Sequence, residues 1–281
     1  MQGRVVGPWG LDGRQGVQGS RLVHQLHVGV APERQRRRRV ACQFLGHLDV
    51  CAAGDQTADV RVPQGATGGY GWETYQEYFV EMTAAWKQDY PNIQHYYIFQ
   101  IWPNSCAMGG TWHSDKLREV QRTLPRLYAH MSVMSILGIR PPGYAHYPPE
   151  GYAVMAGLIA PLVERDNYGK VFDNAITAPD VQKAYYTSDR HDEIALEFGQ
   201  PMAWSDALTG QFYLDGKEGK VASGTVSGNV VKLKLATAER AETVTYLVDR
   251  KWDIKNLLYG ENGIAALTFC DVPILPGKPS P

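Results

Sequence analysis

The chain has 281 residues, which is enough for one large domain or for two domains of ordinary size. A formal net charge of −1 gives no attraction of the whole molecule to nucleic acid or anionic lipid, and 44% hydrophobic residues favour a packed core. No run of about 18 apolar residues is present, so we predict no membrane-spanning helix. The first residues also lack the apolar core of an export signal. We therefore expect no nucleic-acid partner and no membrane partner.

Residues 1–65 differ in composition from the rest of the chain. They contain no Lys, Ile or Tyr, but nine Arg and ten Gly. The segment PERQRRRRVACQ is basic enough for a nucleic-acid patch, yet no aromatic residues interleave with it. We predict a low-complexity or disordered Arg/Gly-rich arm. A shifted reading frame over this segment is an alternative hypothesis.

Residues 66–172 alternate between helical and strand patterns. The sequence predicts helices over 72–86, 114–128 and from Gly151 to about Arg165, and strands over 93–102 and 130–137. This alternation is typical of an α/β layer. Two strands are few for a parallel sheet, which needs cover on both faces, so we expect an incomplete three-layer domain.

Residues 173–276 carry strand patterns only. The segments EIALEF, QFYLD, VVKLKLA, ETVTYLVD and IAALTFCDVPI are separated by Gly, Asp and Asn. Several short strands over about 100 residues predict an all-β, sandwich-like domain. Residues 277–281 are expected to form a solvated tail.

The four cysteines show no metal-site or disulfide pattern. Cys42, Cys51, Cys106 and Cys270 are scattered without C-x-x-C spacing. We expect neither a bound metal ion nor a cofactor.

His146 is presented by a proline-rich segment, GYAHYPPEGY, ahead of the third predicted helix. Pro148 and Pro149 stiffen this segment, and a histidine can accept and return a proton near neutral pH. In α/β folds, sites gather at the carboxyl ends of strands, and the segment follows such an end. The residues alone leave two interpretations open, a catalytic base and a side chain that caps a turn.

Four further residues are candidates for ligand binding. Trp102 and Asn104 follow the end of a predicted strand, where an aromatic ring can stack on a sugar. Arg118 and Gln121 lie in LREVQ on a predicted helix and could face the same site. A solvated helix face is the alternative for these two residues.

Residues 68–170 resemble the sialate O-acetylesterase-like carbohydrate esterases, a branch of the SGNH hydrolase superfamily. The similar segments are GWETYQEYFVEMTAAWKQDYP, YYIFQIW, LREVQ and HYPPEGYAVMAGLIAPLVERDNYGK. They correspond to about the last third to half of such a catalytic domain. The resemblance implies an SGNH-type (flavodoxin-like) three-layer fold without its N-terminal catalytic segments. It also implies serine-type hydrolysis of acetyl esters on sugars without a cofactor, His146 as the general base, and an extracellular or periplasmic location.

Two positions differ from the pattern of that family. The nearest counterpart of its G-D-S nucleophile motif is AGDQ, with Gln56 in place of the serine. The aspartate position of its D-x-x-H motif holds Gly143. A second hypothesis is therefore a non-catalytic carbohydrate-binding or interaction protein derived from such an esterase.

Overall fold

A computed structural model of the chain describes residues 72–103, 114–139, 147–248 and 253–277. The predicted arm over 1–65 lies outside these residues. The helices of the first part are α3 (Trp72–Asp89), α4 (Ser114–Thr123), the 3-10 turn η3 (Leu124–Arg126) and α5 (Pro149–Tyr168), and its strands are β1 (Tyr96–Gln100) and β2 (Met131–Ser135). The second part contains β3 (Val181–Tyr186), β4 (Glu193–Phe198), β5 (Met202–Ala203), η4 (Asp206–Gln211), β6 (Phe212–Leu214), β7 (Val221–Ser227), β8 (Val230–Leu235), β9 (Thr243–Tyr246), β10 (Tyr259–Gly260) and β11 (Phe269–Leu275).

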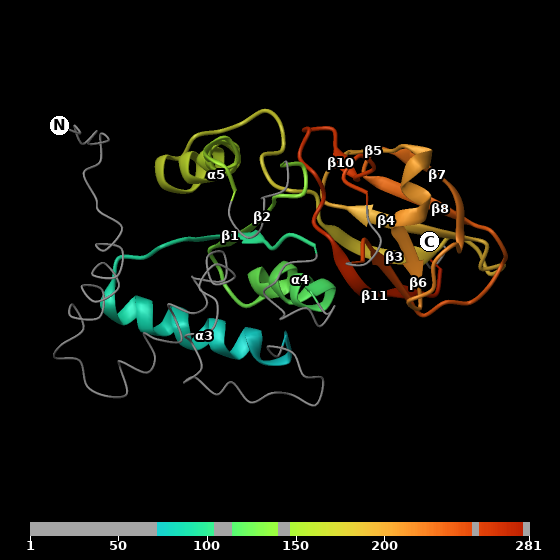
Figure 1. The fold of residues 1–281 in the computed structure, drawn as a ribbon, viewed down its shortest axis with the longest axis horizontal. Coiled ribbons are helices and arrows are strands. Elements are labelled where there is room, and N and C mark those ends of the chain that lie inside the picture. Colours follow the sequence, from blue (N-terminus) through green and yellow to red (C-terminus); the bar gives the residue numbers. More distant parts are fainter. Residues whose placement is uncertain (1–71, 104–113, 140–146, 249–252, 278–281) are drawn as a thin grey trace, which may run out of the picture.

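The first part is built around a parallel pair of strands. β1 and β2 run in register from Tyr96 opposite Met131 to Gln100 opposite Ser135. Helix α5 lies on one side of the pair, and α3 and α4 lie on the other (Figure 1). The apolar stripes of the helices explain this placement, because Phe79 of α3 packs near β1 while Leu162 of α5 packs on β2. The α/β character predicted for this part is confirmed.

Helix α4 is shorter than its sequence pattern predicts. The predicted helix reached Tyr128, whereas α4 ends at Thr123 and η3 follows. Pro125 explains the early end, because it has no backbone N–H and its ring clashes with the preceding turn of an α-helix. As a result Leu127, which an α-helix continued from Leu117 and Leu124 would place on their buried side, is 53% exposed.

The second part contains a seven-stranded mixed sheet in the order β6-β9-β11-β3-β4-β8-β7. Strands β3 and β11 are parallel, and the other neighbours in this sheet pair antiparallel. Strands β4 and β8 form where their apolar residues predicted strands, whereas β7 was not predicted, because VASGTVS has only two large apolar residues. A short antiparallel pair of β5 and β10 accompanies the large sheet.

The two parts share interior packing. Ala178 and Leu267, which belong to the β-rich part, pack in one cluster with Val133, Met134 and Leu162 of the α/β part. Buried apolar surface therefore continues across the predicted domain boundary near residue 172. None of the helices in the described residues is long and apolar enough to cross a bilayer.

Candidate functional site

The carboxyl edge of the β1–β2 pair is filled on one side by the β-rich part. The Gln100 side chain donates from Nε2 to the carbonyl oxygen of Thr268 at 2.9 Å, and its Oε1 accepts from the Thr268 N–H at 2.8 Å. Ser135 Oγ donates to the carbonyl oxygen of Ala266 at 3.3 Å. Residues 266–268 thus cross the ends of both strands and fix this half of the edge.

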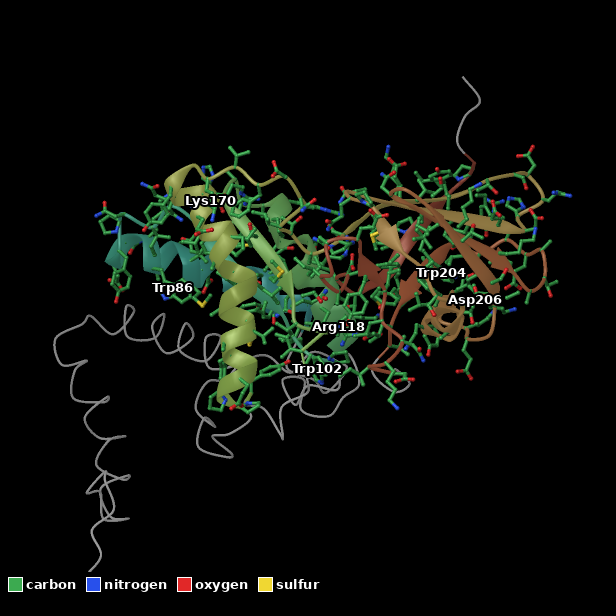
Figure 2. The ribbon with its side chains drawn as sticks, turned by 90° about the horizontal axis from the view of Figure 1, so that it is seen from above. Trp86, Trp102, Arg118, Lys170, Trp204 and Asp206 are labelled. Carbon is green, nitrogen blue, oxygen red and sulfur yellow. The ribbon has the colours of Figure 1, made fainter. Side chains whose placement is uncertain are left out.

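Arg118 is fully buried where the two parts of the molecule meet (Figure 2). Its Nε donates to Thr268 Oγ1 at 2.8 Å, and its guanidinium donates to the carbonyl oxygen of Leu247 at 3.1 Å. Leu247 has a φ of 67°, a left-handed conformation that is rare for a bulky residue. The guanidinium therefore anchors a locally strained backbone to α4.

Gln121 is also buried, one helical turn from Arg118. Its Oε1 accepts from the N–H of Ile101 at 2.9 Å, and its Nε2 donates to Tyr75 Oη at 3.3 Å. Burial raises the pKa of Tyr75, so the phenol stays protonated. Both predicted ligand-binding residues of α4 face the interior and bond to protein groups. A direct contact of Arg118 or Gln121 with a ligand stays a prediction.

An ion-pair group on α4 adds to these contacts. Arg122 pairs with Glu119 at 2.5 Å and with Asp180 at 2.7 Å. Glu119 also accepts a hydrogen bond from the Cys270 N–H at 3.1 Å. Burial raises the pKa of Asp180, and the Arg122 guanidinium opposes that rise. The polar face of α4, which its sequence pattern indicates as solvated, is therefore an internal contact surface.

The other half of the edge is formed by aromatic side chains. Trp102 follows β1, and its half-buried ring meets the ring of Tyr147 edge to face, with centroids 6.4 Å apart and planes at 88°. Tyr147 lies just before α5 and is only 7% exposed. The contact joins the end of β1 to the start of α5. Trp102 thus lies just past a strand end, as the sequence analysis expected, and the structure adds its contact with Tyr147, which the sequence did not indicate.

The Tyr147 ring packs closely on Gly151 in the first turn of α5. A Cβ atom added at Gly151 would lie 2.7 Å from Tyr147 Cδ1, closer than real contacts allow. The Tyr147 hydroxyl is buried and has no hydrogen-bond partner among the described residues. Burial raises the pKa of this phenol strongly, so it stays neutral. The sequence analysis did not single out Tyr147, because a tyrosine next to a candidate histidine has no distinctive pattern.

The remaining predicted site residues cannot be placed. His146 and Asn104 lie outside the described residues, directly next in sequence to Tyr147 and Pro103. Within the described part of the chain, no group of three or more His, Cys, Asp or Glu side chains could hold a metal ion.

Comparison with solved structures gives a likeness in fold. No protein-family model matches the sequence, and no curated protein matches it. Among solved structures, the chain is similar to a carbohydrate acetylesterase from Xanthomonas citri, with a TM-score of 0.53 and 17% sequence identity. The match covers 70% of this chain and 45% of the acetylesterase, so the chain spans less than half the length of that protein. At this identity the likeness shows a shared fold.

Proposed function

We propose that the chain is a carbohydrate O-acetylesterase that hydrolyses acetyl esters on sugars by serine-type chemistry, with His146 as the general base. The observation that carries the proposal is the contact between Trp102 and Tyr147 at the carboxyl edge of the parallel strands. It brings the residue that follows His146 against an aromatic ring that can hold a sugar. Sites of α/β proteins gather at this edge.

The chemistry explains the choice of residues. An alcohol nucleophile is weak until a neighbouring imidazole accepts its proton during attack on the ester carbonyl. The same imidazole then returns a proton to the departing sugar hydroxyl. Trp102 offers a ring for stacking on the sugar, and the Asn104 amide can bond its hydroxyls. Within this proposal, Arg118 and Gln121 act as positioning residues, since Gln121 holds the backbone of Ile101, directly before Trp102.

The structural likeness supports the same class of reaction. The similar solved structure is described as a carbohydrate acetylesterase, and it shares the fold over 70% of this chain. The finer assignment to SGNH-type layering and to the sialate O-acetylesterase-like branch rests on the sequence resemblance over 68–170. An acetylated carbohydrate is accordingly the proposed partner of the site.

Release of acetate from methyl 6-O-acetylglucoside by the full chain tests the esterase directly. Loss of a general base typically costs 10²–10⁴-fold in rate, so His146→Ala should fall by at least about 100-fold. His130→Ala is the matched control, because His130 lies next to the opposite, amino edge of the same strand pair and is exposed. Equal rates for His146→Ala and the wild type would remove His146 from the mechanism.

A non-catalytic carbohydrate-binding protein is the second candidate. The observations in its favour are Gln56 in AGDQ, where the esterase pattern has serine, and Gly143, where it has the aspartate that orients the histidine. This candidate predicts saturable binding of the acetylated sugar without acetate release above the uncatalysed rate. Acetate release that is lost in His146→Ala would contradict it.

A further inference from the structure

The Tyr147 hydroxyl is a buried polar group whose partner the described residues do not supply. The side chain is 7% exposed, and Oη is shielded from solvent without a hydrogen bond to any described group. Buried hydroxyls in native proteins nearly always have a partner, because an unpaired one loses its hydrogen bonds to water without replacement. The unpaired Tyr147 hydroxyl belongs to a residue at the edge where we expect the ligand to bind. A bound ligand could therefore supply its hydrogen-bond partner.

Among the described residues, no group accepts a hydrogen bond from Tyr147 Oη. Tyr147 belongs to a small apolar cluster, whose other members are Ile136, Ile139 and Met155, with Phe99, Trp102 and Leu158 against it. None of these side chains carries an oxygen. The ring is held by the close approach to Gly151 and by edge contacts with Trp102 and Tyr152. The ring that carries the hydroxyl is therefore held against Trp102.

We infer that the Tyr147 hydroxyl donates a hydrogen bond to a sugar-borne oxygen of the ligand held against Trp102. The acceptor is either a sugar hydroxyl or the carbonyl oxygen of the acetyl ester, and both accept from a neutral phenol. Tyr147 is then a ligand-binding residue of the carboxyl edge, in addition to the residues that the sequence indicates. The inference rests on the proposed carbohydrate ligand and names one contact of that site.

A structural role and a ligand-binding role of the Tyr147 hydroxyl predict different effects on binding when the hydroxyl oxygen is removed. If Tyr147 only packs, Tyr147→Phe fills the same space and removes an unpaired buried hydroxyl. The melting temperature would then rise, and the affinity for the sugar would not change. If the hydroxyl binds the ligand, Tyr147→Phe keeps or raises the melting temperature and weakens binding. One substitution therefore separates packing from recognition.

The experiment measures binding to the full chain by titration calorimetry, with thermal melting on the same samples. The probes are methyl 6-O-acetylglucoside and methyl glucoside. Tyr147→Phe should bind the acetylated probe about three- to ten-fold more weakly than the wild type, the loss expected for one neutral hydrogen bond, with an unchanged or higher melting temperature. Tyr168→Phe, at an 81% exposed tyrosine near the far end of α5, should bind like the wild type.

The two probes identify the acceptor. A loss confined to the acetylated probe assigns the ester carbonyl, and an equal loss for both probes assigns a sugar hydroxyl. Unchanged affinity of Tyr147→Phe, beside a wild type that binds, overturns the inference and leaves the proposed function intact. A wild type that binds neither probe overturns both.

Discussion

Arg118 shows how one side chain connects distant segments of this protein. Its guanidinium bonds Thr268 and the carbonyl of Leu247, which follow it in the chain by 150 and 129 residues. A charged group with no exposed surface is tolerated only when its hydrogen bonds are made inside the protein. We therefore expect its removal to be among the most destabilising single changes in the chain.

Arg118→Met tests this role. The substitution keeps much of the volume but leaves Thr268 Oγ1 and the Leu247 carbonyl without their donor. Hydrogen bonds to charged groups contribute about 1.5–3 kcal/mol each, so the free energy of unfolding should fall by about 2–4 kcal/mol in urea denaturation. Arg126→Met, at an exposed arginine nearby in the chain, should change it by less than about 0.5 kcal/mol. Equal stability of the two variants would show that the buried bonds contribute little.

Residue types and spacing predicted part of the candidate site. Trp102 was placed correctly because a residue just past a strand of strong β-propensity lies at the edge of a sheet. Arg118 and Gln121 were expected on a helix face that meets ligand or water, and they are buried. A polar helix normally faces solvent. The segment that covers this one, near Thr268, is far away in sequence, so no local pattern could reveal the contact.

Two glycines of α5 differ in what surrounds them. A Cβ atom at Gly151 would meet the Tyr147 ring at 2.7 Å, whereas one at Gly157 would meet nothing within 4 Å. Gly151→Ala should therefore destabilise the protein by about 1–3 kcal/mol through overpacking. Gly157→Ala should stabilise it by about 0.5–1 kcal/mol, because alanine is the better residue inside a helix. Chemical denaturation of both variants measures these changes, and the same sign for both would contradict the packing described for Tyr147.

The turn between β3 and β4 carries a pH-dependent contact to β8. Asp192 accepts hydrogen bonds from Lys234 of β8 at 2.6 Å and from Ser188 at 3.0 Å, and these bonds lower its pKa from 3.8 to about 2. A lowered folded-state pKa gives stability that is present above the unfolded pKa and is lost as the pH falls through the folded one. Asp192→Asn should therefore melt below the wild type at pH 6, and the difference should shrink between about pH 4 and pH 2. A difference that does not vary with pH would exclude this ion pair as its source.

Among the helices and strands, those with a strong periodicity of apolar residues were predicted best. Helices α3 and α5 and strands β1, β2, β4 and β8 follow from their apolar patterns. Strand β7 has small polar residues and is held by its pairing with β8 and by Trp204, whose ring would lie 2.1 Å from a Cβ atom at Gly224. Such a strand exists because of its neighbours, which a local pattern cannot show.

In the whole molecule, the α/β part and the β-rich part form a continuous interior. Strand patterns in the sequence predicted a change of character near residue 172, and α5, which ends at Tyr168, is followed by strands from β3 onward. The packing of Ala178 and Leu267 on β2 and α5, and the bonds of Gln100 with Thr268, hold the two parts together. The carboxyl edge of β1 and β2 is therefore shaped by both parts, and residues 266–268 bound it on one side.

The account depends most on an acetylated sugar binding at that edge, and calorimetric titration of the full chain with methyl 6-O-acetylglucoside tests this directly. We predict saturable binding of one sugar per chain that is weakened at least about ten-fold in Trp102→Leu, because stacking on the indole ring is lost. Trp204→Leu, at a half-buried tryptophan of the β-rich part that stacks on Phe212, should bind like the wild type (Figure 2). No saturable binding by the wild type, or the same affinity in Trp102→Leu, would contradict the account.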